Sequence, residues 1–227
     1  ELLAKSLKVS PLLAQLLINR GVADAQSGSA FLRPKLTDLI SPELLPGVKP
    51  ASQRIQQALT QKQKITLYGD YDVDGTTATA LLLLFLQGAG ARVDFYLPQR
   101  LKEGYGLNID AVKKIHAQGT KLMITADCGI GNDEEIRWAM ENGLDLIVTD
   151  HHEVPEVLPP ALAILNPKQK NCPYPFKSLA GVGVAFNLII ALRSSLRQGG
   201  FFQPGRVPNL KEYLDLVALG TVSDIVP

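Results

Sequence analysis

Three aspartates at alternate positions, Asp70, Asp72 and Asp74, directly follow the apolar segment 65–69. Strand residues two apart point to the same side, so a strand that ends here would deliver these carboxylates as one cluster. Clustered carboxylates repel one another, which makes the arrangement costly unless a cation lies among them. We therefore predict a divalent metal ion at this point of the chain.

Two more groups of metal-ligand type follow apolar segments further along: Asp127, and the triplet Asp150, His151 and His152. Oxygen ligands with one or two imidazoles suit Mg²⁺ or Mn²⁺, and the imidazole favours Mn²⁺, whereas zinc usually takes more nitrogen or sulfur. Five or more ligands exceed what one ion needs, and two ions about 3.5–4 Å apart are the usual arrangement for hydrolysing phosphate esters. The predicted chemistry is two-metal phosphoester hydrolysis.

Simpler explanations compete with this metal site. The segment 70–75 matches the opening of an EF-hand loop, but Leu81 stands where that loop needs its twelfth-position glutamate. The aspartates could also form a solvated acidic turn, and the histidines could be ordinary loop residues. Two of the three histidines in the chain, His151 and His152, are adjacent at a predicted strand end, which favours the site. His116 lies on a predicted helix and is assigned no function.

From residue 64 the pattern alternates between strands and helices, which predicts an α/β fold with a parallel sheet flanked by helices. Strands are expected near 64–70, 92–97, 121–127, 144–150 and 161–165, and helices near 75–88, 108–118 and 132–142. Asn108 and Asn132 stand at N-cap positions, and Gly119 and Gly143 follow the helix ends. Ligands of such sheets bind beyond the carboxyl ends of the strands, where all three acidic groups lie.

The first 63 residues differ in pattern from the rest of the chain and are predicted to form a small N-terminal helical appendage, with helices over 11–21 and 53–61. The catalytic domain is expected to span 64–227. In it, a helix over 181–192 opens with Gly181 and Gly183, whose backbone could bind an anion or allow close packing, and a last helix runs over 210–219.

The composition is that of an ordinary globular protein, with 46% hydrophobic and 20% charged residues, and the net charge of +1 says little about partners. Two cysteines, Cys128 and Cys172, are too few for a disulfide framework or a zinc ribbon. The longest apolar run, 80–86, is far shorter than the roughly 20 residues of a membrane helix. We expect a cytoplasmic protein without a membrane partner, and both chain ends suggest a fragment.

A loop after the second strand carries Arg100 and Lys102, which could hold a substrate phosphate, and Tyr105 between two glycines. We predict these three as substrate-binding residues, although a solvated loop explains the two basic residues equally well. Asp224 follows the last helix, and by spacing alone it is as easily a helix cap as a ligand.

Taken together, these motifs resemble the DHH phosphoesterase superfamily, and within it the RecJ-type single-strand-specific exonucleases. The four motifs of that resemblance stand here at 68–75, 126–129, 149–152 and 219–224, and the segments 15–21, 97–106 and 179–184 are also similar to RecJ-type sequences. The resemblance covers nearly the whole chain.

The resemblance implies a role for each motif residue. It assigns metal binding to Asp72, Asp74, Asp127, His151 and Asp224, with Asp127 as the bridge, and Asp70 as a further ligand or a partner of one. It implies that Asp150 orients the histidines. His152 would contact the scissile phosphate and stabilise transition-state charge.

The implied reaction is 5′-to-3′ degradation of single-stranded DNA to mononucleotides with two Mn²⁺ or Mg²⁺ ions, in DNA recombination and repair. Implied partners are single-stranded DNA, single-strand DNA-binding protein and recombination or mismatch-repair helicases. A DHH-associated domain and an oligonucleotide-binding domain are expected outside this chain, so that the chain alone would cleave poorly.

Three alternatives stay open. DHH phosphodiesterases for short oligonucleotides or cyclic dinucleotides, and family II pyrophosphatases, typically carry His in place of Asp70 and lack residues 1–63. A catalytically silent replication scaffold would have lost some of the ligands. A metal-binding regulatory domain would need neither His152 nor a phosphate-holding rim.

Overall fold

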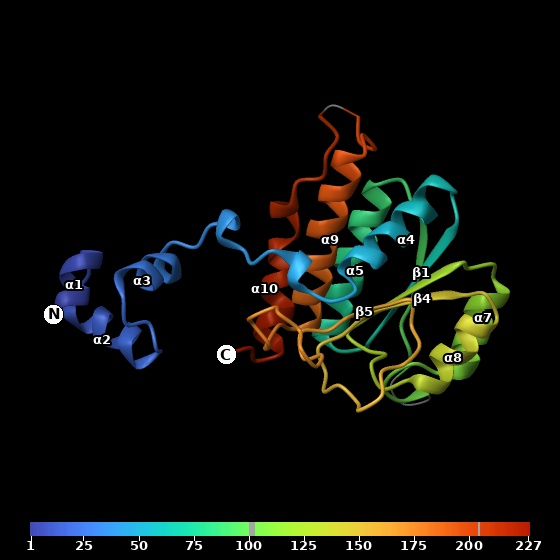
Figure 1. The fold of residues 1–227 in the computed structure, drawn as a ribbon, viewed down its shortest axis with the longest axis horizontal. Helices are drawn as coiled ribbons and strands as arrows, with labels where there is room; N and C mark the ends of the chain where they lie inside the picture. The colour runs from blue at the N-terminus through green and yellow to red at the C-terminus, as the bar shows by residue number, and fades with distance from the viewer. Residues whose placement is uncertain (100–102, 204) are drawn as a thin grey trace. The chain divides into compact units, whose positions relative to one another are not determined.

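The computed structural model describes residues 1–99, 103–203 and 205–227. It divides into two compact units, residues 1–41 and 42–227 (Figure 1). No helix in these ranges is both long enough and apolar enough to cross a membrane.

The smaller unit is helical. It contains α1 (Leu2–Leu7), α2 (Pro11–Asn19), α3 (Ala25–Leu32) and the short 3₁₀ turn η1 (Leu36–Asp38). Ser10 and Asp24 accept hydrogen bonds from the first turns of α2 and α3, which satisfies N–H groups that have no partner within the helix. A small core of Leu3, Ala4, Ala14 and Leu17 joins these helices.

The larger unit is built on a five-stranded parallel sheet, and the predicted α/β fold is confirmed. The strands are β1 (Lys64–Gly69), β2 (Arg92–Tyr96), β3 (Leu122–Ala126), β4 (Asp145–Thr149) and β5 (Ala163–Leu165), in the order β2-β1-β3-β4-β5. Its helical segments are η2 (Pro42–Leu44), α4 (Val48–Thr60), α5 (Val73–Gly88), α7 (Ile109–Ala117), α8 (Asp133–Glu141), α9 (Gly181–Gln198), η3 (Leu210–Tyr213) and α10 (Leu214–Ser223).

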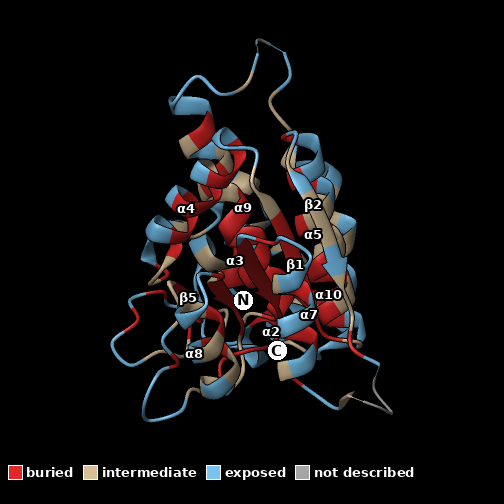
Figure 2. Cartoon of the chain, turned by 90° about the vertical axis from the view of Figure 1, so that its right-hand side faces the viewer, coloured by how far each residue is buried: buried red, intermediate tan, exposed pale blue. Residues whose placement is uncertain are grey.

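Helices cover both faces of this sheet, with α4, α5, α9 and α10 on one side and α7 and α8 on the other (Figure 1). Figure 2 shows buried residues on the strands and on the inward sides of the helices. The strands alternate between the two layers, so that Met123 and Val148 pack toward Val112 and Ile136 of α7 and α8. Both faces are covered, which is why the strands read as nearly continuous apolar runs.

Helix α4 belongs to the larger unit, whereas the sequence placed it in an appendage ending at residue 63. Its Arg54 Nε lies 2.5 Å from Asp145 Oδ2, and its Nη2 donates to the carbonyl of Lys121 at 3.3 Å. Ile55 on the same helix is buried. The helix starts at Val48, before the predicted residue 53, because Pro50 is tolerated in a first turn. Contacts therefore divide the chain after residue 41.

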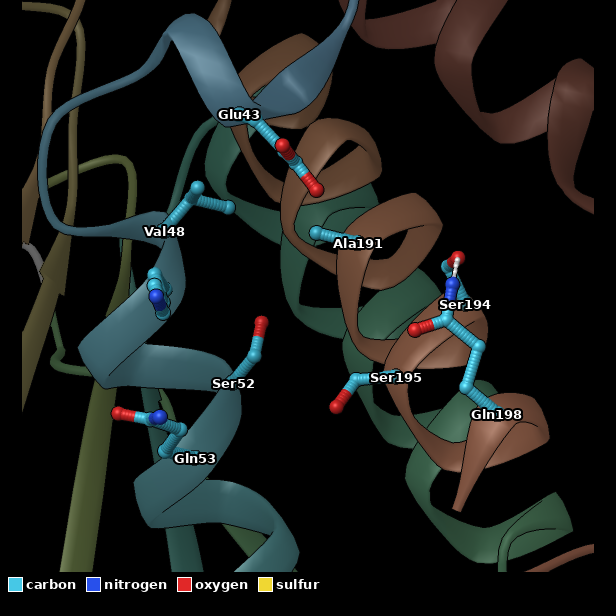
Figure 3. A pocket seen from close by; sticks show the side chains of 9 residues that line it. Glu43, Val48, Ser52, Gln53, Ala191, Ser194, Ser195 and Gln198 are labelled. Carbon is cyan, nitrogen blue, oxygen red and sulfur yellow. Dashed lines mark hydrogen bonds between the residues drawn. The ribbon is translucent and has the colours of Figure 1, made fainter. Parts of the chain in front are cut away.

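A groove of about 340 Å³ lies between α4 and α9, and Ser52 and Ser195 face each other across it (Figure 3). None of the acidic groups singled out by the sequence lines this groove. Those groups gather instead at the carboxyl edge of the sheet.

Candidate metal centre

The first acidic group lies where β1 passes into α5. Asp70 follows the strand, and its N–H donates to the carbonyl of Ala126 at 3.2 Å. Asp72 caps α5, and its Oδ1 accepts the N–H of Gly75 at 2.8 Å. The expectation that all three aspartates project from a strand is wrong, since β1 ends at Gly69. They converge because the chain turns into a helix: a Cβ on Gly75 would lie 2.8 Å from the Asp70 Cα, so only glycine allows this close approach.

Asp74, in the first turn of α5, is buried and holds the start of α9. Its Oδ2 accepts the N–H of Gly181 at 2.5 Å, and its Oδ1 accepts the N–H of Val182 at 2.8 Å. Ala180 supplies no side-chain cap to α9, so Asp74 does so from another helix. Burial raises the pKa of Asp74, and these two N–H groups oppose the rise.

The sequence predicted either anion binding or close packing for Gly181 and Gly183, and the structure shows both at Gly181. The anion at the helix start is the carboxylate of Asp74 itself. The close packing is against Asp127, because a Cβ on Gly181 would lie 2.6 Å from the Asp127 Cβ. Gly183 is less crowded, with only the Leu179 side chain at 3.1 Å.

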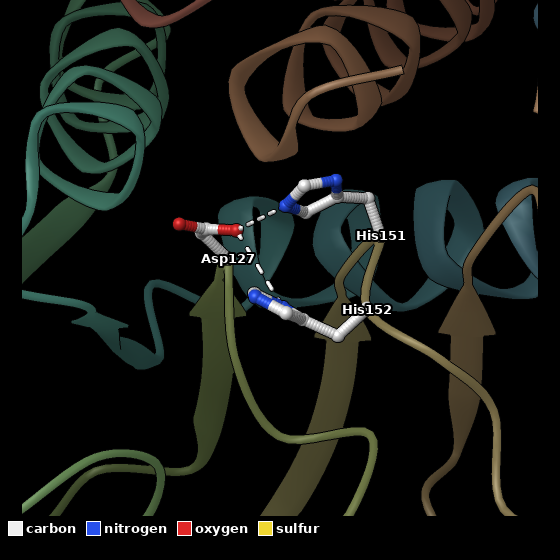
Figure 4. A group of neighbouring side chains, drawn as sticks. All are labelled: Asp127, His151 and His152. Atoms are coloured by element: carbon white, nitrogen blue, oxygen red, sulfur yellow. Dashed lines mark ion pairs between the residues drawn. The ribbon is translucent and has the colours of Figure 1, made fainter. Parts of the chain in front are cut away.

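Asp127 lies at the centre of the site, directly after β3. It has a left-handed backbone with φ of 66°, and its N–H donates to the carbonyl of Thr149 at 2.9 Å. The side chain is 1% exposed, and Oδ1 receives no well-aligned hydrogen bond in the described chain, although His151 Nε2 lies 3.1 Å away (Figure 4). Burial raises the pKa of Asp127 to about 7, against the lowering effect of His151.

His151 stands among three carboxylates from three parts of the chain. Besides Asp127, its Nε2 lies 3.7 Å from Asp74 Oδ2, and its Nδ1 lies 3.7 Å from Asp224 Oδ2. Asp224 reaches the site because α10 runs to Ser223, beyond the predicted end at 219. Burial lowers the pKa of His151, but the carboxylate of Asp127 outweighs it and the net shift is upward.

Asp150 is fully buried and holds the neighbouring histidines. Its Oδ2 accepts the N–H of Ile130 at 2.9 Å, and its Oδ1 accepts the N–H groups of His151 and His152 at 2.7 and 3.1 Å. The ring Nδ1 of His152 lies 2.7 Å from the same Oδ1. Burial would raise the pKa of Asp150, but these hydrogen bonds lower it; the bond to Asp150 raises the pKa of His152 to about 9.

The predicted ligands, together with His152, form three overlapping groups; within each group the ligand atoms lie within 4.8 Å of one another. They are Asp74 with His151 and Asp224, Asp70 with Asp72 and Asp127, and Asp127 with His151 and His152. Because Asp127 and His151 are shared, the groups form one continuous set. A hollow of about 160 Å³ opens beside Asp72, Asp74 and Asp224. The buried Oδ1 of Asp127 and the oxygen-rich set fit divalent cations of the Mg²⁺ or Mn²⁺ type.

Of the predicted rim residues, Tyr105 lies at the site, with its Oη 2.9 Å from His152 Nδ1. Arg100 and Lys102 lie outside the described residues. Gly220 was not predicted as a site residue, although a Cβ there would lie 2.9 Å from Asp74 Oδ1 and 2.5 Å from Thr77 Oγ1. The sequence did carry a signal for Gly220: it is a glycine inside an apolar helix, in the same motif as Asp224.

Known proteins have sequences similar to this chain. The description "DHH family, N-terminal domain" matches residues 64–221. The single-stranded-DNA-specific exonuclease RecJ of Bacillus subtilis is 48% identical over 225 residues, which are 99% of this chain and 27% of that protein. The RecJ of Escherichia coli is 42% identical, over 97% of this chain and 38% of that protein. The chain thus spans about a third of the length of these curated relatives.

The fold is also similar to solved structures. RecJ from Thermus thermophilus in complex with Mn²⁺ matches with a TM-score of 0.79 at 34% identity, over 99% of this chain and 30% of that one. Exonuclease RecJ bound to manganese matches with a TM-score of 0.71 at 40% identity, over 81% of this chain and 44% of that one. Because the family match at 64–221 contains the whole sheet and every residue of the centre except Asp224, the chain belongs to the DHH family.

Proposed function

We propose that this chain carries the metal-binding part of a 5′-to-3′ exonuclease that hydrolyses single-stranded DNA to mononucleotides. The observation that carries the proposal is the overlap of three ligand groups on Asp127 and His151. One set of shared ligands between two cation positions is the arrangement that phosphodiester hydrolysis uses.

The residues present fit two ions of the Mn²⁺ or Mg²⁺ type. Asp74, His151 and Asp224 would hold one ion, Asp70 and Asp72 the other, and Asp127 would bridge them. When bound, such ions activate water and neutralise charge on the phosphate. Asp74 is kept in place for this task by the start of α9, and Asp72 by the first turn of α5.

His152 and Asp150 serve the substrate side of the centre in this proposal. Asp150 accepts only, because it is ionised, so the nearby Nδ1 of His152 carries a proton. With its pKa raised to about 9, His152 keeps a second N–H at Nε2 near neutral pH. That N–H donates to a phosphate oxygen as negative charge develops there, which lowers the barrier.

Single-stranded DNA as the substrate is supported by the likeness to the RecJ single-stranded-DNA-specific exonucleases. The 5′-to-3′ direction and a role in recombination and repair are the parts of this proposal that the RecJ-type resemblance implies. The chain spans about a third of those relatives, so we propose that further domains complete the groove that holds DNA. We also propose a cytoplasmic location. The partners implied by the resemblance, single-strand DNA-binding protein and repair helicases, stay predictions for capture experiments with the complete protein.

Digestion of 5′- and 3′-labelled single-stranded oligonucleotides with Mn²⁺ tests the proposal on the complete protein. We expect release of 5′ mononucleotides, and a loss of roughly 100-fold or more in Asp127→Ala, because that change removes a shared ligand. Asp133→Ala is the matched control, since the Asp133 side chain at the start of α8 is 44% exposed and forms an ion pair with Arg137, away from the metal centre. Intact DNA together with hydrolysis of dinucleotides would move the assignment to the small-substrate DHH phosphodiesterases.

A further inference from the structure

Residues 104–108, which include Tyr105, form a loop that is anchored at the carboxyl edge of the sheet. Gly104 and Gly106, on either side of Tyr105, have left-handed backbones with φ of 77° and 84°. A Cβ on Gly106 would lie 2.8 Å from Asn132 Oδ1. Two glycines are therefore needed to turn the chain so that Tyr105 projects toward the metal centre.

Hydrogen bonds anchor the residues just after this turn. Tyr68 of β1 donates from its Oη to the carbonyl of Gly106 at 3.2 Å and accepts the N–H of Asn108 at 3.2 Å. Asn132, at the start of α8, accepts the N–H of Leu107 at 3.1 Å. The loop is thus tied to the central strand and to a helix, and the position of Tyr105 is set before any ligand binds.

The phenol of Tyr105 is directed at His152. Its Oη lies 2.9 Å from His152 Nδ1 and 3.3 Å from Nε2, and the two rings meet edge to face at a centroid distance of 5.4 Å. The same Oη donates to the backbone carbonyl of Asp127 at 3.4 Å. Tyr105 therefore connects the backbone of the central aspartate to the imidazole of the proposed phosphate-binding residue.

His152 needs such a contact because Asp150 holds it at one side-chain atom only. The Nδ1 bond to Asp150 does not by itself fix the tilt of the ring, whose centroid lies 4.6 Å from that of His151, and 43% of the His152 side chain is exposed. A hydrogen bond at one atom fixes a distance but not the plane of a ring. Tyr105 supplies a second point of contact on the same edge of the imidazole: the Nδ1–H is shared between Asp150 Oδ1 and Tyr105 Oη, which both accept it, while the tyrosine proton goes to the Asp127 carbonyl.

We propose that Tyr105 is a positioning residue for the hydrolytic step, which holds the His152 imidazole so that its Nε2 faces the scissile phosphate. This inference rests on the proposed function and changes the predicted role of Tyr105, from direct substrate binding to the orientation of His152. About half of the Tyr105 surface is exposed, so stacking of a base on its ring is the competing role.

Kinetics of two variants of the complete protein separate the two roles. Tyr105→Phe keeps the ring and removes the hydroxyl, so positioning predicts a roughly fivefold lower kcat with little change in KM, the effect of one lost hydrogen bond. Tyr105→Leu removes the ring as well. If the phenylalanine variant matches the wild type and the leucine variant only raises KM, the tyrosine binds substrate and the proposal is overturned.

A double-mutant cycle adds a readout that a merely structural role would not move. Because Tyr105 acts through His152, Tyr105→Phe should lower kcat in the wild type but not further in His152→Ala. Equal losses in both backgrounds would show that the hydroxyl acts independently of His152 and would refute the proposal. Mn²⁺ affinity should stay unchanged in Tyr105→Phe, since the phenol belongs to none of the ligand groups.

NMR of the histidine rings in this chain tests the contact without any turnover. The chain has three histidines, so loss of signals in His152→Ala assigns that ring, and His116 serves as internal control. We expect one sharp, Nδ1-protonated set for His152 and broadened or doubled signals in Tyr105→Phe. Unchanged His152 signals would overturn the proposal. If the complete protein cleaves no single-stranded DNA, the proposed function fails, and this experiment alone decides whether Tyr105 orients His152.

Discussion

Replacing Gly181 by alanine tests whether the start of α9 sets the geometry of the metal centre. The added Cβ would lie 2.6 Å from the Asp127 Cβ and Oδ1, whereas ordinary contacts begin at about 3.4 Å. The two residues must therefore separate by about 0.8 Å, the difference between these values. The Asp127 Cβ is fixed by its own backbone, so the neighbour cannot simply rotate away.

Backbone strain does not explain any effect of this change, because Gly181 is not among the residues with positive φ. The cost comes from overpacking, which is typically about 1–3 kcal/mol, and falls on the contact with Asp127. A displacement near 1 Å in a catalytic constellation lowers rates by roughly 100-fold. We expect Gly181→Ala to reduce turnover by about that factor and to weaken Mn²⁺ binding at least tenfold.

Calorimetric Mn²⁺ titration of the chain and digestion of single-stranded DNA by the complete protein measure these effects. Gly183→Ala is the matched control two residues along the same helix, since the nearest atom to its Cβ would be Cδ2 at the flexible end of the Leu179 side chain, at 3.1 Å. We expect that control to stay within about threefold of the wild type. Wild-type Mn²⁺ affinity and turnover in Gly181→Ala would refute the argument that this glycine places Asp127.

The same contacts lead to further predictions about pH dependence, orientation and stability. Burial raises the pKa of Asp127 to about 7, and its proton must leave before a cation binds. The affinity for Mn²⁺ should therefore fall by about tenfold for each pH unit below 7. An affinity that does not change between pH 5.5 and 8 would contradict this. The folded-state pKa values of Asp127 and His152 are raised, so both groups stabilise the metal-free chain at low pH. This stability is lost as pH rises through about 7 for Asp127 and about 9 for His152. Without metal, thermal unfolding should therefore occur at a lower temperature at pH 8 than at pH 5.5. Asp150→Asn should lower turnover at least tenfold with Mn²⁺ binding retained, because the amide cannot accept every N–H that Asp150 holds, and a wild-type rate would exclude the orienting role. Arg54→Ala should destabilise the chain by about 1.5–3 kcal/mol in denaturant unfolding, the contribution of a hydrogen bond to a charged group. The exposed Arg137→Ala should cost at most about 0.5 kcal/mol.

Features that depend on short stretches of sequence were predictable. The apolar runs of β1, β3 and β4 are buried on both faces, so composition alone revealed them, and parallel topology then placed Asp127 and Asp150 at one edge. Asn108 caps α7 as its position suggested, and its Oδ1 accepts two N–H groups of the first turn.

Features that depend on distant contacts were not predictable in the same way. Asp74 and Gly181 are 107 positions apart, and Tyr105 and His152 are 47 apart, so no local pattern pairs them. The end of β1 was also missed, because Asp72 suits a strand end and a helix cap equally well by type. The boundary at residue 63 failed for a similar reason: the partner of Arg54 in α4 is Asp145, far along the chain.

The three most buried aspartates of the centre, Asp74, Asp127 and Asp150, differ in how many hydrogen bonds their carboxylates accept. This difference indicates where a metal ion would stabilise the fold most. Asp150 accepts hydrogen bonds from two backbone segments and a ring, and Asp74 accepts two from the start of α9. Asp127 Oδ1 receives no aligned donor in the described chain, and the ring nitrogens near it are His151 Nε2 at 3.1 Å and His152 Nδ1 at 3.9 Å. An unsatisfied buried carboxylate is costly, so a cation stabilises the fold most at Asp127. Metal binding and the stability of the larger unit are therefore coupled through this one residue.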